Sequence, residues 1–199
     1  MGEFTYETRN ISKNLETYEW DNIWWEQTAN TTSKRILYIG DSISCGTRHC
    51  ITALSNSEIV CDGFGTSKGI DNPHLKASIE LCMKQSKCDM LLFNNGLHGW
   101  HLSNEEYEKY YEELLLFLLK AKKPIYILLT TDDLANPSRI ETIVARNKIA
   151  ASLAQKYNLP VIDLYTVAIN SPEHHIPDGG HFHAEGYNLL AKCILESIG

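Results

Sequence analysis

The chain has 199 residues, which suits one domain with a full hydrophobic core and leaves little room for a second. Hydrophobic residues make up 43% of it and charged residues 22%, the composition of an ordinary globular protein. The formal net charge of −7 and the lack of a basic stripe argue against a nucleic-acid partner, and no apolar run approaches the roughly 20 residues of a membrane span.

Residues 1–33 are predicted to form a polar N-terminal extension with an aromatic cluster at Trp20, Trp24 and Trp25. Its first 14 residues lack the apolar core of a secretory signal. Trp20 and Trp24 are four residues apart, which predicts a short helix with one aromatic face. Such a face either packs against the domain, or places one tryptophan in a sugar-sized pocket or a subunit contact.

Residues 34–199 alternate short β-rich runs with longer helical patterns. The predicted strands are 35–39, 57–61, 89–93, 124–130 and 160–164. The predicted helices are 72–85, 104–121, 137–157 and 184–198. Ser103 with Glu106, and Ser138 with Glu141, have the spacing of capping boxes that open the second and third of these helices.

This alternation predicts a single α/β domain around a parallel sheet with right-handed crossovers. The strands are apolar without strict alternation, which is typical of strands covered on both faces. We therefore expect a flavodoxin-like three-layer sandwich with about five strands. Ligands of such sheets bind beyond the carboxyl ends of the strands, so functional residues are expected there.

The first predicted strand of this domain is followed directly by Gly40-Asp41-Ser42. A glycine at a strand end permits a tight turn that a Cβ would obstruct. Ser42 then lies at the carboxyl edge of the sheet, where it can act as a nucleophile if a base lies within hydrogen-bond reach. The alternative is that this serine only caps the N-terminus of a helix.

A candidate base stands near the other end of the chain, in Asp178-Gly-Gly-His181. An aspartate and a histidine three residues apart on one turn can meet, so that the carboxylate holds Nδ1–H while Nε2 faces the serine. This arrangement fixes the imidazole tautomer and stabilises the imidazolium formed when the serine loses its proton. The two glycines between them give the backbone freedom to bend into that geometry.

Together these two segments resemble the outer signature blocks of the SGNH (GDSL-like) hydrolases. The helix-then-strand pattern of residues 147–165 is also similar to that family, and the resemblance covers residues 34–199. It implies the SGNH hydrolase fold and a catalytic triad of Ser42, Asp178 and His181. It also implies an oxyanion hole built from the Ser42 amide, a glycine amide after the second strand and an asparagine side chain after the third.

Two glycines, Gly63 and Gly65, follow the second predicted strand, and Gly65 is favoured because the turn should open there towards the next helix. After the third strand, the family's GxND block is replaced by an FNxGLH block that resembles an SGNH subgroup. In that block Asn94 corresponds to the family's asparagine, with Asn95 as second choice. Aligning the two blocks on glycine instead puts His98 in this position.

Two other groups of side chains have alternative interpretations. Asp178 with His181 and His183 is a possible metal site, although no partner motif completes the set, so no metal is expected. Asp132 and Asp133 follow the fourth predicted strand, where they either contact substrate hydroxyls or serve a turn.

The six cysteines show no CxxC pair and no regular spacing, which favours free thiols in a reducing, cytoplasmic compartment. Cys45 and Cys50 follow the candidate nucleophile closely. Nothing beside them suggests a lowered pKa, so we interpret both as structural residues.

The resemblance implies a serine esterase that hydrolyses short-chain acyl esters through an acyl-enzyme and without a cofactor. No apolar lid is visible, and the aromatic, asparagine- and histidine-rich strand ends suit a sugar. The expected substrate is therefore a small-molecule or saccharide ester, with carbohydrate O-acetylesterase as the leading hypothesis. The alternatives are a short-chain lipase, a lysophospholipase or thioesterase of the same fold, and an inactive carbohydrate-binding domain. Oligomeric state is left open.

Overall fold

A six-stranded sheet in the order β1-β3-β2-β4-β5-β6 forms the centre of the protein. The computed structural model describes residue 15 and residues 18–199. Its strands are β1 Asp21–Trp24, β2 Lys34–Gly40, β3 Ile59–Thr66, β4 Met90–Phe93, β5 Ile125–Leu128 and β6 Val161–Ile162. Strands β2 to β6 are parallel, in the flavodoxin-like order that we predicted, and β1 adds an antiparallel strand at one edge.

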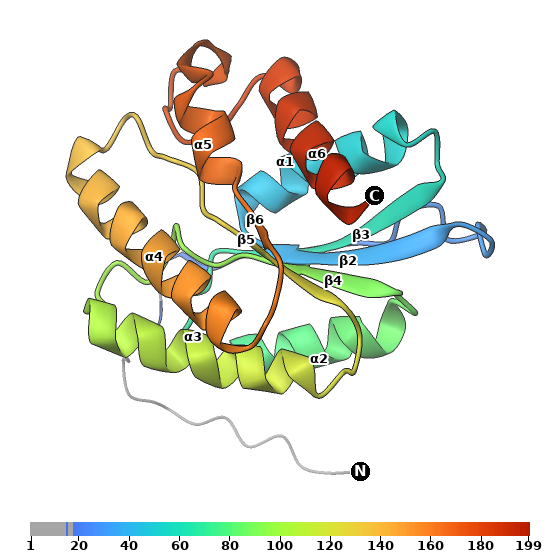
Figure 1. The fold of residues 1–199 in the computed structure, drawn as a ribbon, viewed down its shortest axis with the longest axis horizontal. Coiled ribbons are helices and arrows are strands. Elements are labelled where there is room, and N and C mark those ends of the chain that lie inside the picture. The colour runs from blue at the N-terminus through green and yellow to red at the C-terminus, as the bar shows by residue number, and fades with distance from the viewer. Residues whose placement is uncertain (1–14, 16–17) are drawn as a thin grey trace.

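Six α-helices cover the two faces of this sheet (Figure 1). They are α1 Ser42–Leu54, α2 Leu75–Gln85, α3 Asn104–Leu119, α4 Ile140–Lys156, α5 Leu164–Ile169 and α6 Ala184–Ile198. Helices α1, α5 and α6 lie on one face, and α2, α3 and α4 lie on the other. The expected three-layer, single-domain α/β sandwich is therefore confirmed.

Strand β2 shows why the strands carry apolar residues without alternation. Ile36 and Tyr38 point to the side of α1, α5 and α6, whereas Leu37 and Ile39 point to the side of α2, α3 and α4. All four side chains are buried. A strand covered on both faces needs apolar residues at every position, because neither set of side chains reaches water.

The N-terminal segment differs from our prediction, because Asp21–Trp24 is a strand and not a helix. It pairs with β3 from Asp21 opposite Thr66 to Trp24 opposite Gly63. Pairing with the open edge of β3 stabilises an extended backbone here, although the four-residue spacing of Trp20 and Trp24 favours a helix. Residues 1–14 and 16–17, and with them the predicted lack of a secretory signal, lie outside the described residues.

Strand β3 is longer than predicted and contains both Gly63 and Gly65. We predicted that these glycines follow the strand. A Cβ on Gly63 would lie 2.6 Å from Cδ of Arg48, and one on Gly65 would overlap the Sγ atom of Cys45. The glycines therefore allow helix α1 to approach the sheet closely, which is a packing role that glycine can also have inside a strand.

The helix starts confirm one capping prediction and correct another. Ser103 and Glu106 form the predicted capping box of α3. The second predicted box, Ser138 with Glu141, is wrong, because a 3₁₀ turn over Pro137–Arg139 precedes α4 and no side chain caps the helix. Among the residues that the structure describes, no helix is long and apolar enough to cross a bilayer.

Candidate active site

Ser42 is the first residue of α1, immediately beyond the carboxyl end of β2. The N-cap of the helix is Asp41, whose side chain accepts a hydrogen bond of 2.9 Å from the N–H of Ile43. The interpretation of Ser42 as the cap is therefore wrong. The N–H of Ser42 belongs to the first turn, whose amides have no acceptor within the helix and carry the positive end of its dipole.

The structure brings Ser42, His181 and Asp178 together in one chain of hydrogen bonds. Nε2 of His181 lies 2.8 Å from Oγ of Ser42, and Nδ1 lies 2.7 Å from Oδ2 of Asp178. The side chains of His181 and Asp178 are 42% and 48% exposed, so the site opens directly to solvent. This is the connectivity in which a carboxylate orients an imidazole and the imidazole can remove a proton from a hydroxyl.

Backbone amides hold the carboxylate of Asp178 in place. Its Oδ1 accepts hydrogen bonds from the N–H groups of Gly180, at 3.0 Å, and His181, at 2.9 Å. Partial desolvation acts to raise the pKa of Asp178, but the hydrogen bonds from His181 and Gly180 outweigh it and lower the pKa below its ordinary value. Asp178 is therefore held as a carboxylate that accepts from the imidazole.

Only one of the two glycines in this turn needs to be glycine. Gly179 has a φ of +72°, and a Cβ there would overlap the backbone of Ala135. Gly180 lies in the ordinary region, and the nearest heavy atom to a Cβ there would be an oxygen of Asp133 at 4.0 Å. The freedom that we expected from both glycines is thus required at Gly179 alone.

Gly65, which we favoured as a backbone donor of the expected oxyanion hole, lies inside the sheet. It stands opposite Asn22 of β1 and Gly40 of β2. Backbone N–H groups within a strand point along the plane of the sheet towards a neighbouring strand. The amide of Gly65 is therefore part of a strand and not of the open turn in which we expected it.

The three side-chain candidates of the FNxGLH block lie in different surroundings. Asn94 donates both N–H bonds of its amide, to the carbonyl oxygen of Leu128 and to Oγ1 of Thr130, each at 2.9 Å. It therefore turns towards β5 and has no N–H left for another acceptor. Asn95 is also buried, and it donates to the carbonyl oxygen of Lys68 at 3.1 Å.

His98 is half-buried and lies beside the segment that carries Ser42. Burial raises the pKa of Asp41, and the nearby rings of His98 and His181 act in the opposite direction. Both histidines are therefore electrostatic neighbours of the carboxylate that precedes Ser42. The ring of His98 also meets Trp20 edge to face, with the two ring centroids 6.4 Å apart.

The tryptophans of the N-terminal segment do not share one aromatic face. Trp25 packs against the hydrophobic core, as the first of our two interpretations predicts. Trp24 is exposed and contacts Arg48 and His49 of α1. Trp20 lies next to His98, at the same edge of the sheet as Ser42.

A buried arginine that the sequence did not reveal holds the FNxGLH block. Arg146 of α4 donates to the carbonyl oxygens of Gly96, His98 and Gly99, at 2.7 to 2.8 Å. Its guanidinium also lies 5.0 Å from the ring centroid of Trp100. An arginine in a helical pattern is usually solvent-exposed, so no sequence signal distinguished this one.

Asp132 and Asp133 are both engaged with the protein itself. Asp132 contacts Nε2 of His175 at 3.1 Å, with both side chains buried. Asp133 accepts from Asn136 and from Arg139. These contacts match the structural interpretation of the two aspartates rather than contacts with substrate hydroxyls.

The six cysteines are free thiols. Burial raises the pKa of Cys45, against the opposing effect of Arg48, and burial also raises the pKa of Cys50. The prediction that neither has a lowered pKa is confirmed. In the part of the chain that the structure describes, no three His, Cys, Asp or Glu side chains form a group that could hold a metal ion.

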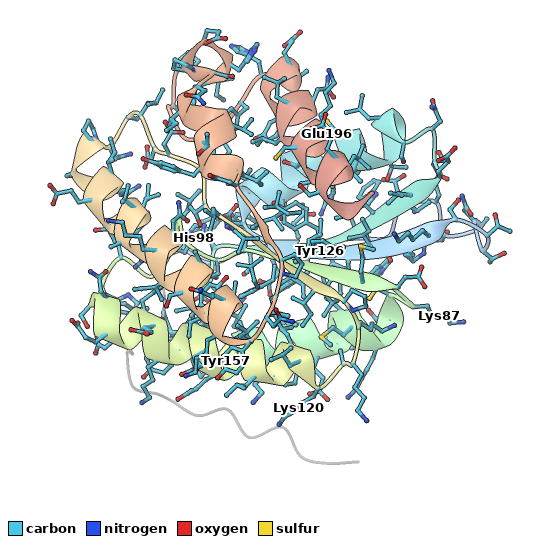
Figure 2. All side chains as sticks on the ribbon, viewed as in Figure 1. Lys87, His98, Lys120, Tyr126, Tyr157 and Glu196 are labelled. Carbon is cyan, nitrogen blue, oxygen red and sulfur yellow. The ribbon has the colours of Figure 1, made fainter. Side chains whose placement is uncertain are left out.

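A cavity of about 1020 Å³ lies at the opposite end of the sheet from Ser42. Its wall includes Arg35 at the start of β2 and Lys87 and Asp89 before β4, and Figure 2 shows Lys87 and His98 at opposite ends of the sheet. Asp62, which lines it, is already paired with Arg35 at 2.6 Å and with Ser86 at 2.7 Å. The candidate active site is therefore at Ser42, at the other end of the sheet from this cavity.

Comparison with known proteins identifies relatives by structure alone, since no protein-family model and no curated protein matches the sequence. The fold is similar to that of a lipolytic protein of the G-D-S-L family from Veillonella parvula, with a TM-score of 0.68 and 18% identity over 82% of this chain and 97% of that one. A lipase/acylhydrolase from Enterococcus faecalis gives a TM-score of 0.67 and 19% identity, over 83% and 95% of the two chains.

A mutant of an acetylxylan esterase from Geobacillus stearothermophilus gives a TM-score of 0.65 and 16% identity, over 84% of this chain and 95% of that one. At these identities the comparisons establish the fold, which is that of the SGNH hydrolases.

Proposed function

We propose that this protein is a serine esterase in which Ser42 is the nucleophile, His181 the general base and Asp178 the residue that orients the base. The observation that carries the proposal is the unbroken chain of hydrogen bonds from Ser42 through His181 to Asp178, with distances of 2.8 and 2.7 Å. A serine hydroxyl is a weak nucleophile by itself, and an adjacent base activates it.

In the proposed mechanism, Nε2 of His181 takes the proton of Ser42 as Oγ attacks the ester carbonyl. The resulting imidazolium is stabilised by Asp178, which stays ionised because its own pKa is lowered. His181 then gives the proton to the leaving alcohol, and an acyl-serine forms. Water, deprotonated by His181, then attacks the acyl group, and His181 returns that proton to Oγ of Ser42 as the acid leaves, so no cofactor is needed.

The negative charge of the tetrahedral intermediate needs hydrogen-bond donors that are already in position. The N–H of Ser42, at the start of α1, is the first donor that we propose. For the side-chain donor we propose His98 in place of Asn94. His98 is an electrostatic neighbour of Asp41, whereas both N–H bonds of Asn94 are already donated to β5 and the loop that follows it. Gly65 remains our candidate for a second backbone donor.

The substrate that we propose is an O-acetylated carbohydrate. The exposed side chains of His181 and Asp178 give a site that a large substrate can approach from solvent. The acetylxylan esterase from Geobacillus stearothermophilus shares the fold. The lipase/acylhydrolase from Enterococcus faecalis shares it as well, so a short-chain lipase remains the alternative substrate class.

The test is hydrolysis of p-nitrophenyl esters of increasing chain length, followed by acetylated xylooligosaccharides, with wild type and Ser42→Ala. We expect wild type to prefer the acetyl ester, and Ser42→Ala to lose about 10³-fold or more of kcat. Ser197→Ala, which removes a hydroxyl from the exposed C-terminal part of α6, is the matched control and should retain full activity.

Three outcomes would count against this proposal. Equal activity of wild type and Ser42→Ala excludes Ser42 as nucleophile. Loss of activity with a chelator favours a metal-dependent hydrolase, because the proposed mechanism needs no metal. A preference for long acyl chains would exclude the carbohydrate O-acetylesterase while leaving a serine lipase.

A further inference from the structure

Beside the proposed triad lies a second histidine–aspartate pair that the mechanism does not use. Nε2 of His175 lies 3.1 Å from Oδ1 of Asp132, and each side chain is only 3% exposed. The other ring nitrogen, Nδ1, faces the carbonyl oxygen of Pro172 at 3.3 Å. Each ring nitrogen thus has an acceptor beside it, and a neutral imidazole donates its single N–H to one of the two. Burying such polar groups is costly unless their hydrogen bonds are kept.

His175 is joined to the segment of His181 through the backbone. It forms an isolated antiparallel bridge with Phe182. On either side of this bridge the N–H of Ile176 donates to the carbonyl oxygen of His181 at 2.9 Å, and the N–H of His183 donates to His174 at 2.7 Å. The ring of His175 also packs on Phe182, with the centroids 4.3 Å apart. A movement of His175 would therefore move the backbone of His181.

The loop that carries Asp132 is held in place by hydrogen bonds on both sides of that residue. The backbone of Thr130, two residues earlier, is bonded at both its N–H and its carbonyl oxygen by the side chain of Asn147 in α4, each at 2.8 Å. Two residues after Asp132, the N–H of Leu134 donates to the carbonyl oxygen of Gly179 at 2.8 Å. The loop after β5 therefore contacts the His181 segment at two points.

We propose that Asp132 and His175 are positioning residues for the esterase reaction, acting as a clamp that sets where the His181 ring stands relative to Ser42. The inference rests on the proposed function and extends it to residues that do not touch the reacting atoms. The clamp acts on geometry, because the side chains of His181 and Asp178 are 42% and 48% exposed and the backbone of their turn is bonded to the His175 segment and to Leu134. A displacement of about 1 Å in a catalytic group can cost about 10²-fold in rate.

The test measures kcat and KM on p-nitrophenyl acetate for Asp132→Asn and His175→Gln, beside the melting temperature of each variant. Asp132→Asn keeps the size of the side chain and removes its charge. We expect kcat to fall by about 10- to 100-fold while KM stays within about twofold, because substrate binding is untouched. Asp132→Glu, which restores the carboxylate, should recover part of the lost kcat.

The matched control is Asp62→Asn, at the other end of the sheet. Asp62 is also a buried aspartate with one partner on a neighbouring strand, Arg35 at 2.6 Å, so its loss should lower the melting temperature without changing kcat of the folded enzyme. If Asp132→Asn and His175→Gln lower only the melting temperature, as Asp62→Asn should, the clamp is structural and the positioning role is overturned.

A second readout does not depend on activity. The ring ¹⁵N shifts of His181 report which nitrogen carries the proton, and in wild type they should show the Nδ1–H tautomer held by Asp178. We expect Asp132→Asn to shift them towards a mixture and Asp62→Asn to leave them unchanged. If wild type lacks Ser42-dependent hydrolysis, the proposed function fails, and these shifts alone decide whether the clamp positions His181. Unchanged ring shifts of His181 in Asp132→Asn would overturn the clamp.

Discussion

Gly46 of α1 lies directly against the ring of Tyr187 of α6, so close that a Cβ on the glycine would overlap the ring. The two residues join the helix that begins at Ser42 to the helix that begins just after His181. The same ring meets Phe182 edge to face at 5.7 Å between centroids. The contact between α1 and α6 thus helps to fix the distance between Ser42 and His181.

Gly46→Ala should therefore destabilise the protein, although alanine is normally better than glycine within a helix by about 1 kcal/mol. Overpacking of this kind costs about 1–3 kcal/mol, which urea denaturation would measure. Tyr187→Leu removes the obstructing ring, so the double variant should lose less than the sum of the two single variants. Strictly additive losses would contradict the contact.

The lowered pKa of Asp178 gives a prediction about acid conditions. A carboxylate whose pKa is lowered in the folded state contributes its hydrogen bonds at every pH above its ordinary pKa, and loses them only as the pH falls through the lower, folded value. In a ¹³C NMR titration, Asp178 should therefore titrate below its ordinary value of 3.8. In His181→Ala the midpoint should rise, and an unchanged midpoint would show that the imidazole does not interact with it.

The turn between Asp178 and His181 provides a matched pair of glycine substitutions. Gly179→Ala puts a Cβ on a residue with a φ of +72° and into the backbone of Ala135, so it should lower both thermal stability and kcat. A strained left-handed residue alone costs about 1–3 kcal/mol. Gly180→Ala has no such conflict and should retain activity. Similar losses in both variants would mean that the turn needs general flexibility and not one positive φ.

If His98 and not Asn94 is the side-chain donor of the oxyanion hole, substitutions of these two residues should have different effects. His98→Ala should lower kcat by about 10²–10³-fold with little change in KM or stability. Asn94→Ala should lower stability by about 1–3 kcal/mol instead, because the carbonyl oxygen of Leu128 and the hydroxyl of Thr130 lose their donor. Kinetics at saturating p-nitrophenyl acetate, with urea denaturation alongside, test both. The reverse pattern would return the role to Asn94.

Two arginines contact Trp100, and only one should matter for stability. Arg146 is buried and donates to three carbonyl oxygens, so Arg146→Ala should cost about 3 kcal/mol or more through lost charge-assisted hydrogen bonds. Arg139 is 40% exposed and pairs with Asp133, so Arg139→Ala should cost less than about 1 kcal/mol. Equal losses in urea denaturation would mean that stacking on Trp100 dominates.

The sequence predicted the parallel sheet and four of its covering helices, α2, α3, α4 and α6, because these elements have strong local patterns. The buried runs of β2 and β4, the capping box at Ser103 and the final helix up to Ile198 all lie close to their expected positions. The residues of the proposed triad were also identifiable, since Ser42, Asp178 and His181 stand at strand and helix ends where short motifs are visible.

The parts that differ depend on long-range contacts. Asp21–Trp24 looked helical from its tryptophan spacing, and only the open edge of β3 makes it a strand. Gly63 and Gly65 looked like the end of a strand, whereas they make room for α1. The direction of the Asn94 side chain depends on Thr130, which lies 36 residues later. No local pattern carries that information.

The hydrogen bond between Ser42 and His181 joins residues 139 positions apart in the chain. A ribosome delivers residues in order at about 5–20 per second, so the hydroxyl emerges several seconds before its base. During that interval the β2–α1 unit can form, but Ser42 still lacks the base that we propose for it and stays a weak nucleophile. The proposed esterase activity would then be a late reporter of folding, which appears only when the segment that carries Asp178 and His181 has docked and not when the sheet first assembles.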